Sequence, residues 1–131
     1  MTFCTSNRQA LLARPAVHNA FVAFCLQAGM GGIDVGRYVL MPDHVHLFVA
    51  IGNGNDLSSG VKSLKNSLSK CRRGEGCSSP RWQKGFFDHV LRSGESYEEK
   101  WEYVRAHPIR AGLIPEDGEW PDQGTVNPLA S

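Results

Sequence analysis

The stretch from His44 to Ile51, H-V-H-L-F-V-A-I, constrains the fold more than any other part of the chain. In a β-strand, alternate side chains point to opposite faces. One face of this stretch would therefore carry Val45, Leu47 and Val49, which is typical of a strand that faces an apolar core. The other face would carry the two histidines and Phe48. The pattern predicts a sheet that packs on a core with one face and presents two imidazoles on the other.

The rest of the chain predicts an α+β fold. We expect strands near residues 1–5, 33–41, 44–51 and 85–92, and helices over 15–28, 56–73 and 96–107. Pro108 disfavours the α conformation before it, so the last helix should end or kink there, followed by a short helical turn. The order predicts an antiparallel sheet of four to five strands, with two helices on one face, in a ferredoxin-like or RNA-recognition-like topology. The last helix would cover the other face, or leave it open to a ligand.

The length of 131 residues indicates one domain, which we place at residues 1–115. Residues 116–131 are acidic and rich in Pro and Gly, and we expect a loosely attached tail. The apolar runs are too short to span a bilayer, and the first residues show no secretory signal. We therefore expect a cytoplasmic protein with no membrane partner and with reduced cysteines.

The net charge of +1 hides an uneven distribution of charge. Residues 60–93 carry eight basic and two acidic side chains, whereas residues 94–131 carry three basic and eight acidic ones. A local excess of +6 is typical of a phosphate-binding surface, but it also fits a solvated helix face. Charge alone leaves both interpretations open.

The two histidines, His44 and His46, have two interpretations of their own. Neutral imidazoles at alternate strand positions can aim a nitrogen at one cation, or they can simply be hydrogen-bonded at the surface. The last helix offers possible partners, because Tyr103 and His107 are four residues apart and lie off its packing stripe of Tyr97, Trp101 and Val104. They fit either packing at the edge of the core or a nucleophile with a third metal ligand.

Three segments together resemble a known family. They are M-P-D-H-V-H-L-F-V, W-Q-K-G-F-F-D-H-V-L-R and E-Y-V-R-A-H-P-I-R-A-G-L-I. In this order and spacing they are similar to the motifs of single-tyrosine HUH transposases, notably the REP-associated tyrosine transposases and their insertion-sequence relatives. The resemblance implies an HUH nuclease fold that acts on single-stranded DNA. It also implies that His44 and His46 bind a divalent metal ion and that Tyr103 is the nucleophile.

The third metal ligand implied by the resemblance is His107, at a position where these transposases usually have Gln or Asn. Mg²⁺ or Mn²⁺ is the expected cofactor, and a three-histidine site also suits Zn²⁺. Attack by Tyr103 on a phosphodiester would give a 5′-phosphotyrosine link and a free 3′-OH, and the reverse attack would rejoin strands. The expected partner is single-stranded DNA with a hairpin, and either a monomer or a homodimer is open. The basic residues expected to contact DNA are Lys62, Lys65, Arg72, Arg73, Arg81, Lys84, Arg105 and Arg110.

Two other functions remain open from the sequence. A domesticated transposase would grip hairpin DNA without cutting it, and the histidine at position 107 keeps that alternative in view. A metal-dependent hydrolase unrelated to DNA would use the three histidines but would need neither Tyr103 nor the basic segment.

Overall fold

The computed structural model describes residues 1–5, 12–51, 56–74, 82–86, 97–115 and 117–126. Its four strands are β1 (Thr2–Cys4), β2 (Ile33–Leu40), β3 (His44–Ile51) and β4 (Gln123–Thr125). They form one antiparallel sheet in the order β1-β3-β2-β4. The helices are α1 (Pro15–Met30), α2 (Leu57–Gly74), α3 (Tyr97–Arg105) and α4 (His107–Arg110). The predicted α+β class with an antiparallel sheet is confirmed.

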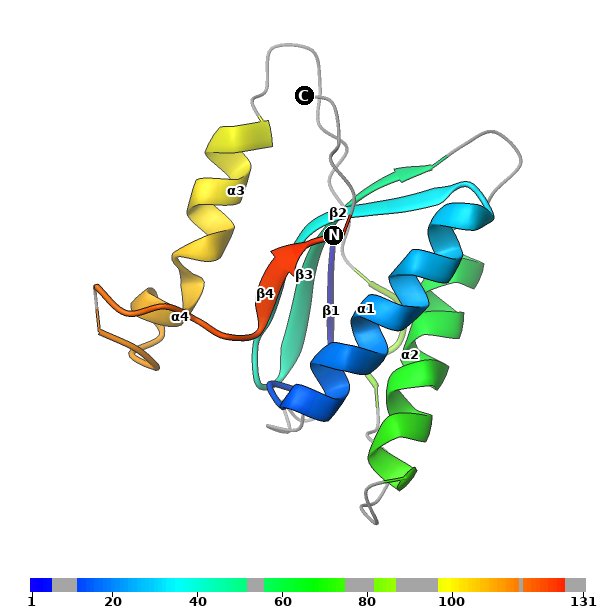
Figure 1. The fold of residues 1–131 in the computed structure, drawn as a ribbon, viewed down its shortest axis with the longest axis horizontal. Helices are drawn as coiled ribbons and strands as arrows, with labels where there is room; N and C mark the ends of the chain where they lie inside the picture. The colour runs from blue at the N-terminus through cyan, green and yellow to red at the C-terminus, as the bar shows by residue number, and fades with distance from the viewer. Residues whose placement is uncertain (6–11, 52–55, 75–81, 87–96, 116, 127–131) are drawn as a thin grey trace.

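The sheet lies between two helical layers (Figure 1). Helices α1 and α2 pack side by side on one face, and α3 lies on the other side of the sheet. The prediction that two helices share one face is therefore confirmed, and of the two alternatives for the other face the structure has the one in which the last helix covers it. The three-histidine arrangement described below is built in the layer of α3.

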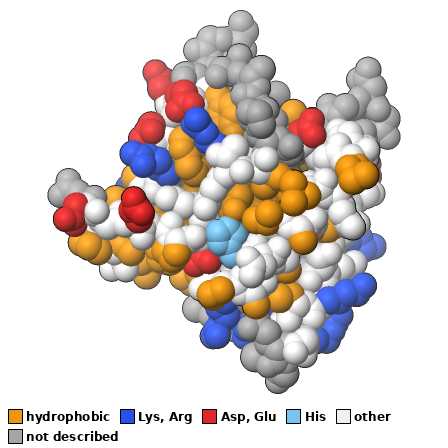
Figure 2. Space-filling view, viewed as in Figure 1, with side chains coloured by type: hydrophobic (Ala, Val, Ile, Leu, Met, Phe, Trp, Pro, Cys, Tyr) orange, Lys and Arg blue, Asp and Glu red, His pale blue; other side chains and the backbone are white. Residues whose placement is uncertain are grey.

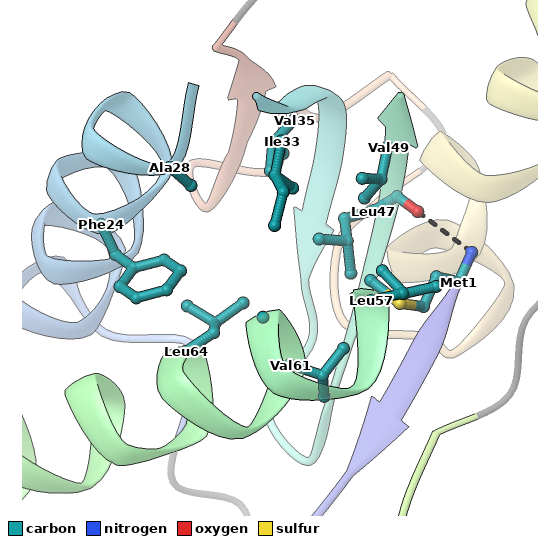
Figure 3. Close-up of a pocket in the computed structure, with 11 residues that line it drawn as sticks. Met1, Phe24, Ala28, Ile33, Val35, Leu47, Val49, Leu57, Val61 and Leu64 are labelled. Atoms are coloured by element: carbon teal, nitrogen blue, oxygen red, sulfur yellow. Dashed lines mark hydrogen bonds between the residues drawn. The ribbon is translucent and has the colours of Figure 1, made fainter. Parts of the chain in front are cut away.

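The apolar core fills the space between the sheet and the α1–α2 layer. Val45 and Leu47 of β3 are buried there with Phe21 of α1 and Leu64 of α2. A small apolar cavity of about 50 Å³ remains within this core, between the two helices and strands β2 and β3 (Figure 3). The alternation in β3 thus places its aliphatic side chains on the core face, as its period of two predicts.

Local signals in the sequence account for the starts of α1 and α2. Pro15 occupies the first turn of α1, where its missing N–H costs nothing. Asp56 precedes α2, and its carboxylate accepts the Ser58 N–H at 3.1 Å, as an N-cap residue does. The predicted end of this helix at residue 28 is two residues too early, because the helix continues to Met30 and is capped at Gly31.

The predicted fourth strand at residues 85–92 lies mostly outside the described residues. Gly85 and Phe86, which are described, are not in a strand. A single bridge joins Trp82 to Thr5, beyond the end of β1. The strand that completes the described sheet is instead β4, which pairs with the edge of β2.

The tail is attached to the sheet over its described part, so the expectation of a loose tail is wrong for residues 120–126. The indole N–H of Trp120 donates to the Leu40 carbonyl at 2.8 Å, and the Leu40 N–H donates to the Asp122 carbonyl at 2.8 Å. The buried Asp122 carboxylate lies 3.5 Å from Nδ1 of His18 on α1. The domain boundary at residue 115 stays a prediction. No helix within the described ranges has the length and apolar character needed to cross a membrane.

Candidate active site

Three histidines converge on the face of the sheet that α3 covers. His44 and His46 come from alternate positions of β3, and His107 is the first residue of α4. Nε2 of His46 lies 3.1 Å from Nε2 of His44 and 3.0 Å from Nδ1 of His107. One ligand atom from each of the three side chains lies within 4.8 Å of the others. The structure therefore brings together the three residues that were predicted from the sequence to be metal ligands.

Two polar side chains orient the strand histidines from behind. The carboxylate of Asp43 lies 2.6 Å from Nδ1 of His44, and the hydroxyl of Thr2 lies 3.0 Å from Nδ1 of His46. Hydrogen bonds of this kind fix the ring orientation and tautomer of metal-binding histidines. Because an ionised carboxylate only accepts hydrogen bonds, Nδ1 of His44 carries the proton and Nε2 presents its lone pair to the cluster.

Burial and charge keep the central imidazole neutral. The pKa of His46 is lowered from 6.5 to about 3, first by burial and then by the neighbouring His44 and His107. The Met1 amino group and the Arg110 guanidinium add smaller effects in the same direction. Neutral imidazole is the form that binds metal ions, so His46 is held ready for that role.

The spacing and chemistry of the three nitrogens fit a divalent cation. Imidazole nitrogens bind Zn²⁺ at about 2.0–2.1 Å, which places two neighbouring ligand nitrogens about 2.9–3.4 Å apart. Two of the three nitrogen pairs, at 3.0 and 3.1 Å, lie in that range, and all three nitrogens lie within 4.8 Å of one another. The N–H of His44 is directed at the Asp43 carboxylate, so its other nitrogen has a lone pair that can bind a cation.

Aromatic packing holds α3 against the sheet. The buried ring of Tyr97 lies 4.8 Å from that of Phe48 on β3, and Trp101 meets the same Phe48 ring edge-on at 6.3 Å. The guanidinium of Arg37 lies over both helix rings, and its backbone N–H donates to the Tyr97 hydroxyl at 2.9 Å. The predicted packing stripe thus fixes the helix that leads to His107.

Tyr103 points away from that packing and is 69% exposed. Helix α3 ends at Arg105, two residues after it, and α4 begins at His107. Pro108 lies in the first turn of α4, as expected for a residue that ends one helix and begins another. The guanidinium of Arg110 lies over the Tyr103 ring at 4.1 Å from its centre. Tyr103 is therefore open to a substrate, four residues before the third histidine.

The basic residues predicted to contact DNA do not form one surface. Lys62, Arg73 and Lys84 are exposed, and Figure 2 shows Lys and Arg side chains along the edge where α2 lies. Arg72 is buried, and the Lys65 ammonium donates to the carbonyls of Gln83 and Gly85 at 3.0 and 2.6 Å. Those two side chains are thus engaged in the fold, which corrects their placement on an open surface.

The remaining predicted contacts lie elsewhere. Arg105 is exposed but pairs with Glu102 at 2.8 Å, and Arg110 lies beside Tyr103. Arg81 lies outside the described residues. Helix α2 and helix α4, which begins at His107, lie on opposite sides of the sheet, so DNA that contacts both must pass around an edge (Figure 1).

Asp43 and Thr2 were missed from the sequence as parts of the site. Asp43 lies directly before His44, and that position beside a candidate metal ligand was an available signal in the sequence. Thr2 had no such signal, because its contact depends on the pairing of β1 with β3, where Thr2 is opposite His46.

The comparison with family models agrees with the resemblance that the sequence motifs indicated. Residues 1–107 match the family model described as IS200-like transposase. The chain belongs to this IS200-like transposase family.

Relatives with known names agree with this assignment. The REP-associated tyrosine transposase of Escherichia coli (strain K12) is 23% identical over 90 residues, which cover 67% of this chain and 52% of that protein. A relative from Haemophilus influenzae is 24% identical over 93 residues, covering 63% and 53%. The matches thus span about half the length of both relatives. A solved structure of a REP-associated tyrosine transposase bound to a REP hairpin is similar with a TM-score of 0.72, at 20% identity, covering 93% of this chain and 72% of that one.

Proposed function

We propose that this chain cuts and rejoins single-stranded DNA, with Tyr103 as the nucleophile and the three histidines as the ligands of a divalent metal ion. The observation that carries the proposal is the convergence of His44 and His46 of β3 with His107, which follows Tyr103 by four residues. Nε2 of His46 lies 3.1 Å from His44 and 3.0 Å from His107. Structural packing alone does not need three imidazoles with facing nitrogens on a face otherwise held by aromatic rings.

The reaction exchanges one phosphodiester for another. The Tyr103 hydroxyl oxygen attacks the phosphorus, its proton leaves, and the bond from phosphorus to the 3′ oxygen breaks. The products are a 5′-phosphotyrosine and a strand that ends in a 3′-OH. Attack by another 3′-OH on the phosphotyrosine rejoins DNA and restores the tyrosine. A divalent metal bound by the histidines would withdraw charge from the phosphate and so ease both attacks.

The donor set favours some metal ions over others. Family resemblance favours Mg²⁺ or Mn²⁺, whereas three imidazoles suit Mn²⁺ or Zn²⁺ better than Mg²⁺, which prefers oxygen ligands. We therefore propose Mn²⁺ or Zn²⁺ as the better-bound ion and Mg²⁺ as the weaker one.

The proposed DNA substrate contains a hairpin beside a single strand. The similar solved structure is of a transposase bound to a REP hairpin, which supports a hairpin for this chain. The exposed cations Lys62, Lys70 and Arg73 lie on α2, which has no acidic residue to oppose them, and can contact a phosphate backbone. Binding should weaken steeply as salt rises, because each neutralised phosphate releases counterions.

A covalent-adduct assay tests the proposal. The full chain is mixed with a fluorescent hairpin oligonucleotide carrying a single-stranded arm, with Mn²⁺, with Mg²⁺ or with EDTA, and separated under denaturing conditions. We expect an adduct that requires metal and disappears in Tyr103→Phe and His46→Ala. The other two tyrosines provide matched controls, and Tyr38→Phe and Tyr97→Phe should retain the adduct. Normal adduct formation by Tyr103→Phe would contradict the proposal.

The second candidate function is hairpin binding without cleavage. The observation in its favour is the histidine at position 107, where the family usually has an amide side chain. In that case the wild-type chain binds the oligonucleotide with the same steep salt dependence but forms no adduct with either Mn²⁺ or Mg²⁺. The same gel, run beside a non-denaturing one, therefore separates the two functions.

A further inference from the structure

We propose that Arg110 is a positioning residue that holds the Tyr103 ring and the end of α3 in place for attack on the phosphate. This inference rests on the proposed function of Tyr103 and adds a role for a neighbouring side chain. Three features of the structure support it: a contact with the ring, a contact with the backbone, and the location of the guanidinium charge.

The first feature is the contact with the ring. Tyr103 is 69% exposed, so core packing does little to restrict its side chain. The Arg110 guanidinium lies 4.1 Å from the ring centre, and within the part of the chain that the structure describes it is the only group found over that ring. A guanidinium over an aromatic face is attracted to its negative quadrupole. Arg110 therefore restricts a nucleophile that would otherwise sample several rotamers.

The second feature is a hydrogen bond to the backbone of the same residue. Nη1 of Arg110 donates to the Tyr103 carbonyl at 2.6 Å. That carbonyl is among the last four of α3, which lack N–H partners within their own helix. Because the helix is interrupted between α3 and α4, the side chain of Arg110, seven positions later, can reach back to the Tyr103 carbonyl. One planar side chain thus closes the end of the helix and covers the ring.

The third feature is the position of the guanidinium on the short helix that carries the third histidine. Arg110 follows His107 by three residues in α4, and side chains at that spacing are neighbours on a helix surface. A guanidinium has five N–H groups, and only one donates to the Tyr103 carbonyl. The others suit a phosphate oxygen, for which Arg has a matching planar geometry. Arg105 is not equivalent, because its guanidinium pairs with Glu102.

The test begins with the protein alone, by NMR. We expect nuclear Overhauser effects between the Arg110 side chain and the Tyr103 ring protons, and a change in the Tyr103 ring shifts in both Arg110→Ala and Arg110→Lys. Lys keeps the positive charge but lacks the planar guanidinium group, so a change in the Lys variant as well shows that the charge alone does not hold the ring. Arg14→Ala removes an exposed arginine at the start of α1 and should leave the Tyr103 signals unchanged. Absence of the Overhauser effects in the wild type would overturn the proposed contact.

The second measurement is single-turnover adduct formation at saturating hairpin oligonucleotide. We expect Arg110→Ala to slow the step at least about tenfold, since small displacements of a nucleophile are costly. Its oligonucleotide Kd should change less, and added guanidinium ion should restore part of the rate. A rate equal to wild type, or a loss explained by Kd alone, would overturn the positioning role. If the wild type shows the Overhauser effects but forms no adduct, the proposed cleavage function fails and the contact is structural only.

Discussion

The two faces of the β-sheet are built from different kinds of side chain. Beneath α1 and α2, Val45 and Leu47 of β3 are buried against apolar neighbours such as Phe21. Beneath α3, the same strand contributes His46 and Phe48, which contact imidazoles, a hydroxyl and aromatic rings. Apolar burial is non-directional, whereas hydrogen bonds and ring contacts depend on angle. We infer that the first face carries most of the stability and that the second carries the chemistry.

The largest expected effects come from substituting two neighbouring residues of β3, one on each face of the sheet. Leu47→Ala removes a buried core side chain, and we expect a loss of about 2–5 kcal/mol in the free energy of unfolding. His46→Ala should cost less stability but abolish measurable Mn²⁺ or Zn²⁺ binding, because it removes the central ligand. Urea denaturation and isothermal titration calorimetry, performed on both variants, check the pair. A Leu47→Ala variant that folds but binds no metal would show that the faces are not separable in this way.

Substitution of Asp43, which contacts His44, should have the next largest effect, a loss of metal affinity. Asp43→Ala removes the carboxylate that orients this imidazole at 2.6 Å, and we expect metal affinity to fall about 10–100-fold. Asp43→Asn keeps a hydrogen-bond acceptor without the charge, so its affinity should lie between Ala and wild type. Calorimetric titration with Zn²⁺ measures both. Equal affinities for all three proteins would mean that Asp43 serves only the turn.

The tail strand offers a smaller test. A Cβ atom on Gly124 would lie 2.9 Å from the Tyr38 hydroxyl, which itself lies 2.6 Å from Nε2 of His18. Gly124→Ala therefore forces a shift in a rigid, hydrogen-bonded ring, and we expect a cost of about 1–3 kcal/mol in unfolding free energy. Gly74→Ala, at a position with open space, serves as the control. An unchanged denaturation midpoint for Gly124→Ala would show that β4 is not held against Tyr38.

The smallest expected effect is a gain in the free energy of unfolding, whereas the substitutions above lower stability or metal affinity. Gly60 lies in α2 beside the apolar cavity, where a Cβ atom would meet only Cδ1 of Ile33, at 3.3 Å (Figure 3). Ala is favoured over Gly inside helices by up to about 1 kcal/mol. Because Ile33 can move into the cavity, Gly60→Ala should stabilise the fold by up to that amount. A lower thermal midpoint for Gly60→Ala than for wild type would mean that the Ile33 side chain cannot move away from the added methyl group.

The sequence was most informative where a residue pattern repeats at a fixed period. The alternation in β3 predicted its bounds and its two faces, because strand geometry fixes side-chain direction. Val61, Leu64 and Leu68 recur at helical spacing in the sequence, and they lie on the buried face of α2. The motif resemblance added the histidine cluster, and the structure brings His107 beside His46.

The sequence was least informative where a contact depends on distant pairing. Strand β4 has three residues, Q-G-T, without alternation, so only the available edge of β2 makes it a strand. Two basic residues, Lys65 and Arg72, looked like surface cations, yet the fold engages the first and buries the second. Charge patterns do not reveal such partners, because a side chain bonds to whatever the tertiary fold brings near.

The sequence by itself therefore determined the strand with its histidine pair, the helices and the family. Local periodicity and residue chemistry are sufficient for these features. Only the tertiary structure decided that Thr2 supports His46, that the tail completes the sheet, and that Arg110 covers Tyr103. Each of these depends on a strand register or a helix break. A directional contact exists only when distances and angles are fixed by the whole fold.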